Sequence, residues 1–153
     1  MSIDQRLSDL GITLPQPAAP VAAYVPAVEQ GGLLHISGQI SFGEDGNLIL
    51  GRLGDDVNLD RGMEAARRCG IMLLAQIKAA LGSLDRVERI VKLGVFVNSA
   101  PHFTDQPKVA NGASELMQEV FGDAGRHARS AVGVAVLPLG VAVEVDAIVA
   151  VKA

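Results

Sequence analysis

The strongest structural signal in this sequence is a long amphipathic pattern between positions 59 and 81. Its recurring positions are spaced by three and four residues: Met63, Ala66, Gly70, Leu73, Ile77 and Leu81. This spacing places the side chains on one face of an α-helix, and that face must be buried against a sheet or another helix. Gly82 follows as a stop signal. We therefore predict a helix over residues 59–81.

Shorter patterns on both sides of this helix predict an α+β chain. Residues 2–10 have helical spacing, and the prolines of segment 11–20 indicate an extended connector. A second helix is expected from Thr104, as its N-cap, to Phe121. Strands are expected at residues 22–28, 33–38, 48–50, 87–97, 130–137 and 141–151, with turns at 31–32, 45–47 and 138–140. This order predicts a β-meander in the first third and a sheet with both helices packed on one face.

Composition narrows the possible classes of function. The 153 residues, 49% of them hydrophobic, are enough for one packed domain. We place an N-terminal helix and connector at residues 1–20 and the domain at residues 21–153. The net charge of −4, with no run of basic residues, argues against a nucleic-acid partner. No apolar stretch approaches the ~18 residues of a membrane span, so no membrane partner is expected. A single cysteine favours a reducing cytoplasm, and the aliphatic composition favours an oligomer.

Several common catalytic motifs do not occur in the sequence. The histidines at positions 35, 102 and 127 are far apart, and no spacing typical of metal ligands is present. The sequence has neither a phosphate loop nor a dinucleotide fingerprint, and Ser37 is not part of a nucleophile elbow. Cys69 lies among apolar residues of the long helix, where a buried structural thiol is expected. We therefore expect no metal or organic cofactor.

A few polar residues are candidates for a binding or catalytic site. Arg129 lies where a loop meets an apolar strand, so it either binds a carboxylate or is a solvated residue at a strand end. Glu144 and Asp146 alternate with apolar residues and share one sheet face, which is either wet or covered by an oligomer. Tyr24, on the expected first strand, and Asn111, followed by a glycine, are compatible with packing or with a polar role. These residues alone do not identify a reaction.

Longer motifs connect these residues. The first is Tyr24–Val28 followed by Leu33–Ile40, and the second, more specific one is Ala128–Pro138 followed by Val143–Ala147. From Tyr24 onward the chain resembles the YjgF/YER057c/UK114 (RidA-type) family, which also includes the proteins called endoribonuclease L-PSP. The long N-terminal extension and the segment Asp105–Lys108 indicate a divergent subgroup.

The resemblance implies a fold, an assembly and an activity. The implied fold is a chorismate-mutase-like α+β layer, and the implied assembly is a homotrimer with clefts between subunits. The implied activity is hydrolytic deamination of reactive 2-imino or enamine acids, such as 2-iminopropanoate, to 2-oxo acids and ammonia. By this resemblance, Arg129 binds the substrate carboxylate and Glu144 orients or activates the attacking water. No cofactor is implied.

The resemblance also assigns the remaining parts of the cleft. Tyr24, contributed across the subunit boundary, and Asn111 match other polar groups, and the backbone amides near Gly38 and Ala131 complete the cradle for the carboxylate. Ala131 stands where many members carry a cysteine, so a side chain there is not required for chemistry. The alternative function is a non-catalytic trimer that senses or sequesters a small carboxylate. A ribonuclease role, sometimes attached to the family, is disfavoured by the acidic balance.

Overall fold

The computed structural model describes residues 1–17, 19–20 and 22–153. In this described part, the chain forms a five-stranded sheet with the order β1-β2-β5-β3-β4. Its strands are β1 (Ala27–Gln30), β2 (Leu33–Ile40), β3 (Val87–Asn98), β4 (Ala128–Val134) and β5 (Val143–Val151). The sheet is mixed, because β3 and β4 are parallel while the other neighbours are antiparallel. The edge strand β4 is therefore reached by a crossover through a helix.

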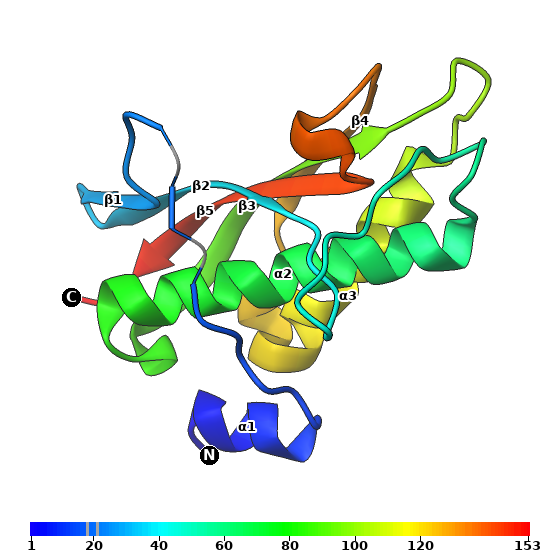
Figure 1. Cartoon of the computed structure of the whole chain (residues 1–153). Coiled ribbons are helices and arrows are strands. Elements are labelled where there is room, and N and C mark those ends of the chain that lie inside the picture. Colours follow the sequence, from blue (N-terminus) through cyan, green and yellow to red (C-terminus); the bar gives the residue numbers. More distant parts are fainter. Residues whose placement is uncertain (18, 21) are drawn as a thin grey trace.

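The helices are α1 (Ile3–Asp9), α2 (Leu59–Leu81) and α3 (Gln106–Phe121). Figure 1 shows α2 and α3 side by side on one face of the sheet, with α1 below them, which confirms the predicted α+β fold class. The prediction for α2 is confirmed at both ends. Asn58 caps its start by accepting a hydrogen bond from the Arg61 amide at 2.8 Å, and Gly82 ends it in the left-handed region at φ 82°. None of the described helices has the length and apolar character needed to cross a bilayer.

The second predicted helix begins later than expected. Asp105, not Thr104, occupies the N-cap of α3, and its side chain makes no capping bond. Pro107 lies in the first turn, where the missing amide hydrogen is not needed for a helical bond. The start is therefore set by the proline rather than by a capping hydroxyl.

The predicted first strand is largely wrong. Residues 22–24 form a bend instead of a strand, and β1 begins only at Ala27. Pro26 cannot donate to a ladder, and the Ser37 hydroxyl donates to the carbonyl of Val25 at 2.9 Å, so β2 holds this segment as a loop. The expected domain boundary at Val21 lies outside the described residues.

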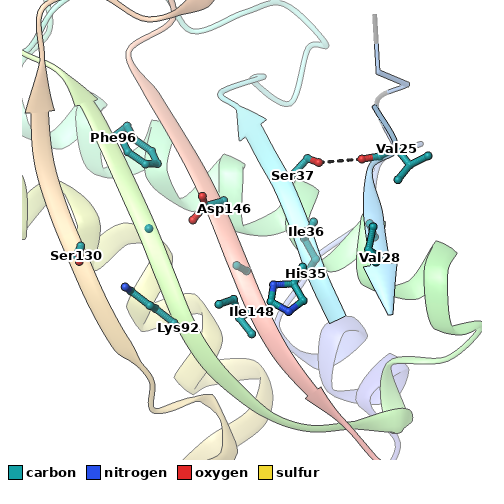
Figure 2. Close-up of a pocket in the computed structure, with 13 residues that line it drawn as sticks. Val25, Val28, His35, Ile36, Ser37, Lys92, Phe96, Ser130, Asp146 and Ile148 are labelled. Atoms are coloured by element: carbon teal, nitrogen blue, oxygen red, sulfur yellow. Dashed lines mark hydrogen bonds between the residues drawn. The ribbon is translucent and has the colours of Figure 1, made fainter. Parts of the chain in front are cut away.

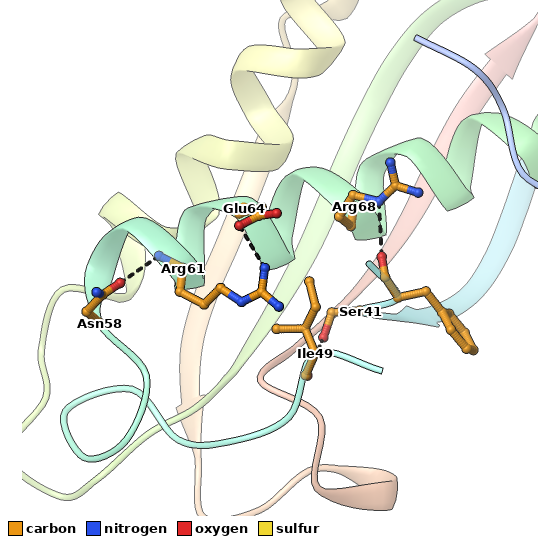
Figure 3. Close-up of polar contacts among 7 residues, drawn as sticks. Ser41, Ile49, Asn58, Arg61, Glu64 and Arg68 are labelled. Carbon is orange, nitrogen blue, oxygen red and sulfur yellow. Dashed lines mark hydrogen bonds and ion pairs between the residues drawn. The ribbon is translucent and has the colours of Figure 1, made fainter. Parts of the chain in front are cut away.

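The predicted meander also ends early. Residues 48–50 make only isolated bridges, from Leu48 to Phe42 and from Leu50 to Val141. Figure 3 shows two hydrogen bonds of this loop: Arg68 Nε of α2 donates to the Phe42 carbonyl at 3.0 Å, and within the loop Ser41 Oγ donates to the Ile49 carbonyl at 3.1 Å. The segment therefore packs against the helix instead of extending the sheet. The last two strands are β4 and β5, which start and end close to the predicted 130–137 and 141–151.

The core lies between the sheet and the two long helices. Strand β5 alternates strictly between buried residues and half-buried residues. Val143 and Val145 are fully buried on the side that α2 covers, whereas Glu144 and Asp146 lie on the opposite side, called the open face below. The predicted alternation of this strand is confirmed. Cys69 is fully buried in α2, and burial raises the pKa of its thiol, as expected for a structural cysteine.

Candidate functional site

Arg129 projects from the edge strand toward the helices. On β4 it pairs with Leu93 of β3, which is fully buried under the helices. Its Nη1 donates to Asn111 Oδ1 at 2.8 Å and to Ser114 Oγ at 3.1 Å, and both acceptors belong to α3. Its Nε and Nη2 have no hydrogen-bond partner among the described residues. The guanidinium is thus held on one edge and leaves two donors for a carboxylate.

Two residues that the sequence reasoning missed extend this contact. The oxygen of Ser114 lies 2.8 Å from His127 Nε2, and His127 Nδ1 lies 2.7 Å from the carbonyl oxygen of Gly125. Burial is the main cause that lowers the pKa of His127; the bond to Gly125 raises it in part, and the positive charge of Arg129 lowers it by a smaller amount. A sequence signal existed: Ser114 follows Asn111 by three helical positions, and His127 precedes Arg129 by two extended ones.

These residues line an open cavity of about 480 Å³ beside α3. Its walls are formed by Asn111, Ser114, Gln118, Arg126, His127 and Arg129. We call it the arginine pocket. Ala131, the other predicted residue of this strand, is partly buried on the same side of β4 as Arg129, because both pair with helix-facing residues of β3. The structure therefore brings Arg129, Asn111 and Ala131 into one neighbourhood.

The other predicted site residues gather elsewhere. Tyr24, Gly38 and Glu144 line a second cavity of about 360 Å³, together with Pro138, Leu139 and neighbouring residues. We call it the glutamate pocket. Tyr24 and Leu139 are 51% and 73% exposed. The rim of this pocket is thus apolar and open to solvent.

Gly38 lets the carboxylate of Glu144 lie against the backbone of β2. A Cβ atom at position 38 would stand 2.5 Å from Glu144 Oε2. The register between β2 and β5 shifts between Ile36 and Gln39, so a bulge surrounds this glycine. Burial raises the pKa of Glu144, and the nearby negative charge of Asp146 raises it further. Such a carboxylate is easier to protonate than an exposed one and is therefore a stronger base in proton transfer.

The two pockets open on opposite sides of the sheet. Arg129 lies on the side of α3, whereas Glu144 pairs with Phe96 on the open face. The two pockets that they line have no residue in common. A single chain therefore does not bring Arg129 and Glu144 together.

The open face itself holds a third cavity, of about 580 Å³. Figure 2 shows Asp146 near its middle, between side chains of β2 and β3. Burial raises the pKa of Asp146, while the Gly94 amide and Lys92 lower it in part. Among the described residues, no group of three His, Cys, Asp or Glu side chains converges as metal ligands would. The arginine pocket, whose lining includes Arg126 and Arg129 and no carboxylate, suits an organic anion.

The mixed sheet backed by two helices, with site residues split between its faces, defines an α+β protein with pockets on both sides of the sheet. A family model described as "YjgF/chorismate_mutase-like, putative endoribonuclease" matches residues 4–150. The chain belongs to this YjgF family, as the motifs around Tyr24 and Arg129 indicated.

Individual relatives agree with this assignment. The chain is 55% identical over 145 residues to Protein TCP17 of Trypanosoma cruzi, covering 94% of this chain and 91% of the relative. It is 28% identical over 142 residues to a 2-iminobutanoate/2-iminopropanoate deaminase of Dermatophagoides farinae, covering 92% and 95% of the two chains. The crystal structure of protein Atu1372 from Agrobacterium tumefaciens, of unknown function, matches with a TM-score of 0.91 at 45% identity, covering 98% of this chain and 92% of that one.

Proposed function

We propose that this protein hydrolyses small 2-imino or enamine acids to 2-oxo acids and ammonia. The observation that carries the proposal is the guanidinium of Arg129, which α3 holds by one edge, which lines an open cavity, and whose Nε and Nη2 make no hydrogen bond to the described residues. A planar fork with two free donors matches the carboxylate that every 2-imino acid carries. The deaminase of Dermatophagoides farinae, 28% identical to this chain, supports the choice of reaction.

The reaction requires a water molecule and a group that accepts its proton. Water adds to the carbon of the C=N bond, and the C–N bond of the resulting adduct then breaks, so the nitrogen leaves as ammonia and a C=O bond remains. Glu144 takes a proton from the water and returns it to the departing nitrogen, and its raised pKa makes it a stronger base than an exposed carboxylate. Arg129 holds the substrate carboxylate and thereby fixes the position of the reacting carbon.

Arg129 and Glu144 lie on opposite faces of the sheet, and this separation suggests that the site forms between subunits. Arg129 and Glu144 act on one substrate only if they belong to different subunits, so we propose a homotrimer in which the arginine pocket of one chain meets the glutamate pocket of the next. Exposed large apolar side chains support such contacts: Tyr24, Val25, Val28, Leu50, Val132, Val136 and Leu139. The outer edge of β4, which has no further strand beside it in the sheet, is also available to a neighbour.

Mixed oligomers test this division directly. Arg129→Ala and Glu144→Gln are each expected to lose more than nine tenths of the activity, because each removes one half of every site. Co-expression of the two variants is expected to restore about a quarter of the wild-type turnover of 2-iminopropanoate, since a random mixture pairs an intact arginine with an intact glutamate at that frequency. The measurement is ammonia release from 2-iminopropanoate generated in place by an amino-acid oxidase.

The matched control replaces the Glu144→Gln partner with the double variant Arg129→Ala/Glu144→Gln. No site in that mixture contains an arginine, so activity is expected to stay at the level of Arg129→Ala. Equal activity of the two mixtures would show that the residues act within one subunit, or not at all. Wild type without turnover in the same assay would refute the deaminase proposal itself.

The pH profile gives a separate test of Glu144. Turnover is expected to fall as the pH drops through the raised pKa of Glu144, because the protonated acid cannot accept a proton. Asp146→Asn is expected to move this acidic limb to lower pH, since it removes a negative charge that raises the pKa. Asp55→Asn, at an exposed position, is the control. A limb that stays in place in Asp146→Asn would assign it to another group.

A carboxylate-binding trimer without turnover is the second candidate function. It is favoured by the arginine pocket, which is built within one chain and needs no glutamate to hold a carboxylate. In that case pyruvate would raise the Tm of wild type but not of Arg129→Ala, and neither protein would release ammonia.

A further inference from the structure

We propose that Ser114 and His127 are positioning residues that fix the orientation of the Arg129 guanidinium through a directed chain of hydrogen bonds. The inference deepens the proposed function, because it concerns the residue that would hold the substrate carboxylate. It assigns a role to two side chains that the family motifs around Tyr24 and Arg129 do not include.

The direction of the chain follows from its two ends. At one end, Arg129 Nη1 has only hydrogens to give, so Ser114 Oγ accepts at 3.1 Å. At the other end, the Gly125 carbonyl can only accept, so His127 Nδ1 carries the hydrogen in that 2.7 Å contact. In a neutral imidazole Nε2 then carries no hydrogen, so the Ser114 hydroxyl donates to Nε2, with Oγ and Nε2 2.8 Å apart. Every member of the chain is satisfied in this arrangement.

Ser114 and Gly125, the two partners of His127 in the chain, are both held by α3. Ser114 is 6% exposed in the middle of α3. Gly125 packs directly on the end of the same helix, where a Cβ atom would stand 2.9 Å from the Gln118 amide nitrogen. The carbonyl that receives the histidine bond is therefore fixed relative to Ser114. Burial and the charge of Arg129 lower the pKa of His127 and thereby favour the neutral imidazole that this arrangement uses, whereas the bond to Gly125 acts in the opposite direction.

A hydroxyl bonded to an imidazole also resembles a nucleophile and its base. The position of Ser114 argues against that role. It is the ninth residue of α3, where backbone amides are engaged in helical hydrogen bonds and cannot stabilise an oxyanion. Its oxygen also accepts from Arg129. The Ser114–His127 pair therefore orients the Arg129 guanidinium and does not attack a substrate.

Two uncharged replacements of His127 separate positioning from general packing. In His127→Gln the side-chain oxygen reaches the place of Nε2 and still accepts from Ser114, whereas in His127→Asn the shorter amide reaches only the place of Nδ1. We expect the Kd for pyruvate to rise about fivefold in Ser114→Ala and His127→Asn and to stay near wild type in His127→Gln. Ser114→Ala/His127→Asn is expected to bind no worse than Ser114→Ala alone, because both changes break one chain.

Nuclear magnetic resonance of the ligand-free protein tests the inference apart from the proposed function. The imidazole of His127 is expected as the Nδ1–H tautomer. The Nε–H signal of Arg129 is identified by its loss in Arg129→Lys. We expect this signal to shift in Ser114→Ala and His127→Asn but not in His127→Gln. An Nε2–H tautomer, or equal shifts in the Gln and Asn variants, would overturn the positioning role. Wild type that shows the expected spectra but binds no pyruvate would overturn the proposed function alone.

Discussion

Arg129→Ala is expected to lower kcat/KM for 2-iminopropanoate by more than tenfold. A bidentate, charge-assisted contact is worth about 1.5–3 kcal/mol, and the alanine variant loses both of its hydrogen bonds. The loss is expected mainly in KM if Arg129 binds substrate and transition state equally, and in kcat as well if it fixes the reacting carbon. Steady-state kinetics with the oxidase-coupled assay separates the two.

Arg129→Lys sharpens the test. Lysine keeps the positive charge but offers no planar fork, and its ammonium cannot contact Asn111, Ser114 and a carboxylate in the geometry of a guanidinium. We expect its activity to lie between those of wild type and Arg129→Ala. Arg61→Ala, which removes an exposed arginine paired with Glu64, is the control and should leave kinetics unchanged. Wild-type kinetics in a folded Arg129→Ala protein would exclude the arginine from the site.

Gly112→Ala is expected to reduce the free energy of unfolding by about 2 kcal/mol. A Cβ atom there would stand 2.9 Å from the Met63 carbonyl carbon and 3.2 Å from the Arg67 amide nitrogen, both in the backbone of α2. Helix backbone cannot rotate away as a side chain can, so overpacking costs about 3 kcal/mol, the upper end of the usual range. The better helix propensity of alanine returns about 1 kcal/mol. Urea denaturation at a fixed protein concentration measures the difference.

Gly70→Ala is the matched control at the same interface. Its added methyl would meet the tip of the Leu116 side chain, with Cδ2 at 2.8 Å, and that tip can move. The gain in helix propensity then offsets much of the packing cost, so we expect stability within about 1 kcal/mol of wild type. Equal losses in the two variants would mean that α2 and α3 do not approach as closely as the structure has them.

The long helix was the most predictable part of the fold. Its spacing, its stop at Gly82 and its start after Asn58 are local features that point to the same structure. The segment before Ala27 was predicted wrongly because its apolar residues suit a strand, whereas bonds from the distant Ser37 hold it as a loop. The glycine after Asn111, Gly112, suggested close packing in the sequence, and the structure shows it packed against the backbone of α2.

Residue types and short-range order were enough to name the family and to select Arg129, Asn111, Tyr24 and Glu144 as candidates. Alternation along β5 also placed Glu144 on a single face from the sequence alone. The division of these residues between two faces came only from the folded chain, because a one-residue change in the register of a neighbouring strand exchanges its faces. The chain from Arg129 to His127 likewise joins a helix, a loop and a strand edge, and contacts of that kind leave no periodic signal in a sequence.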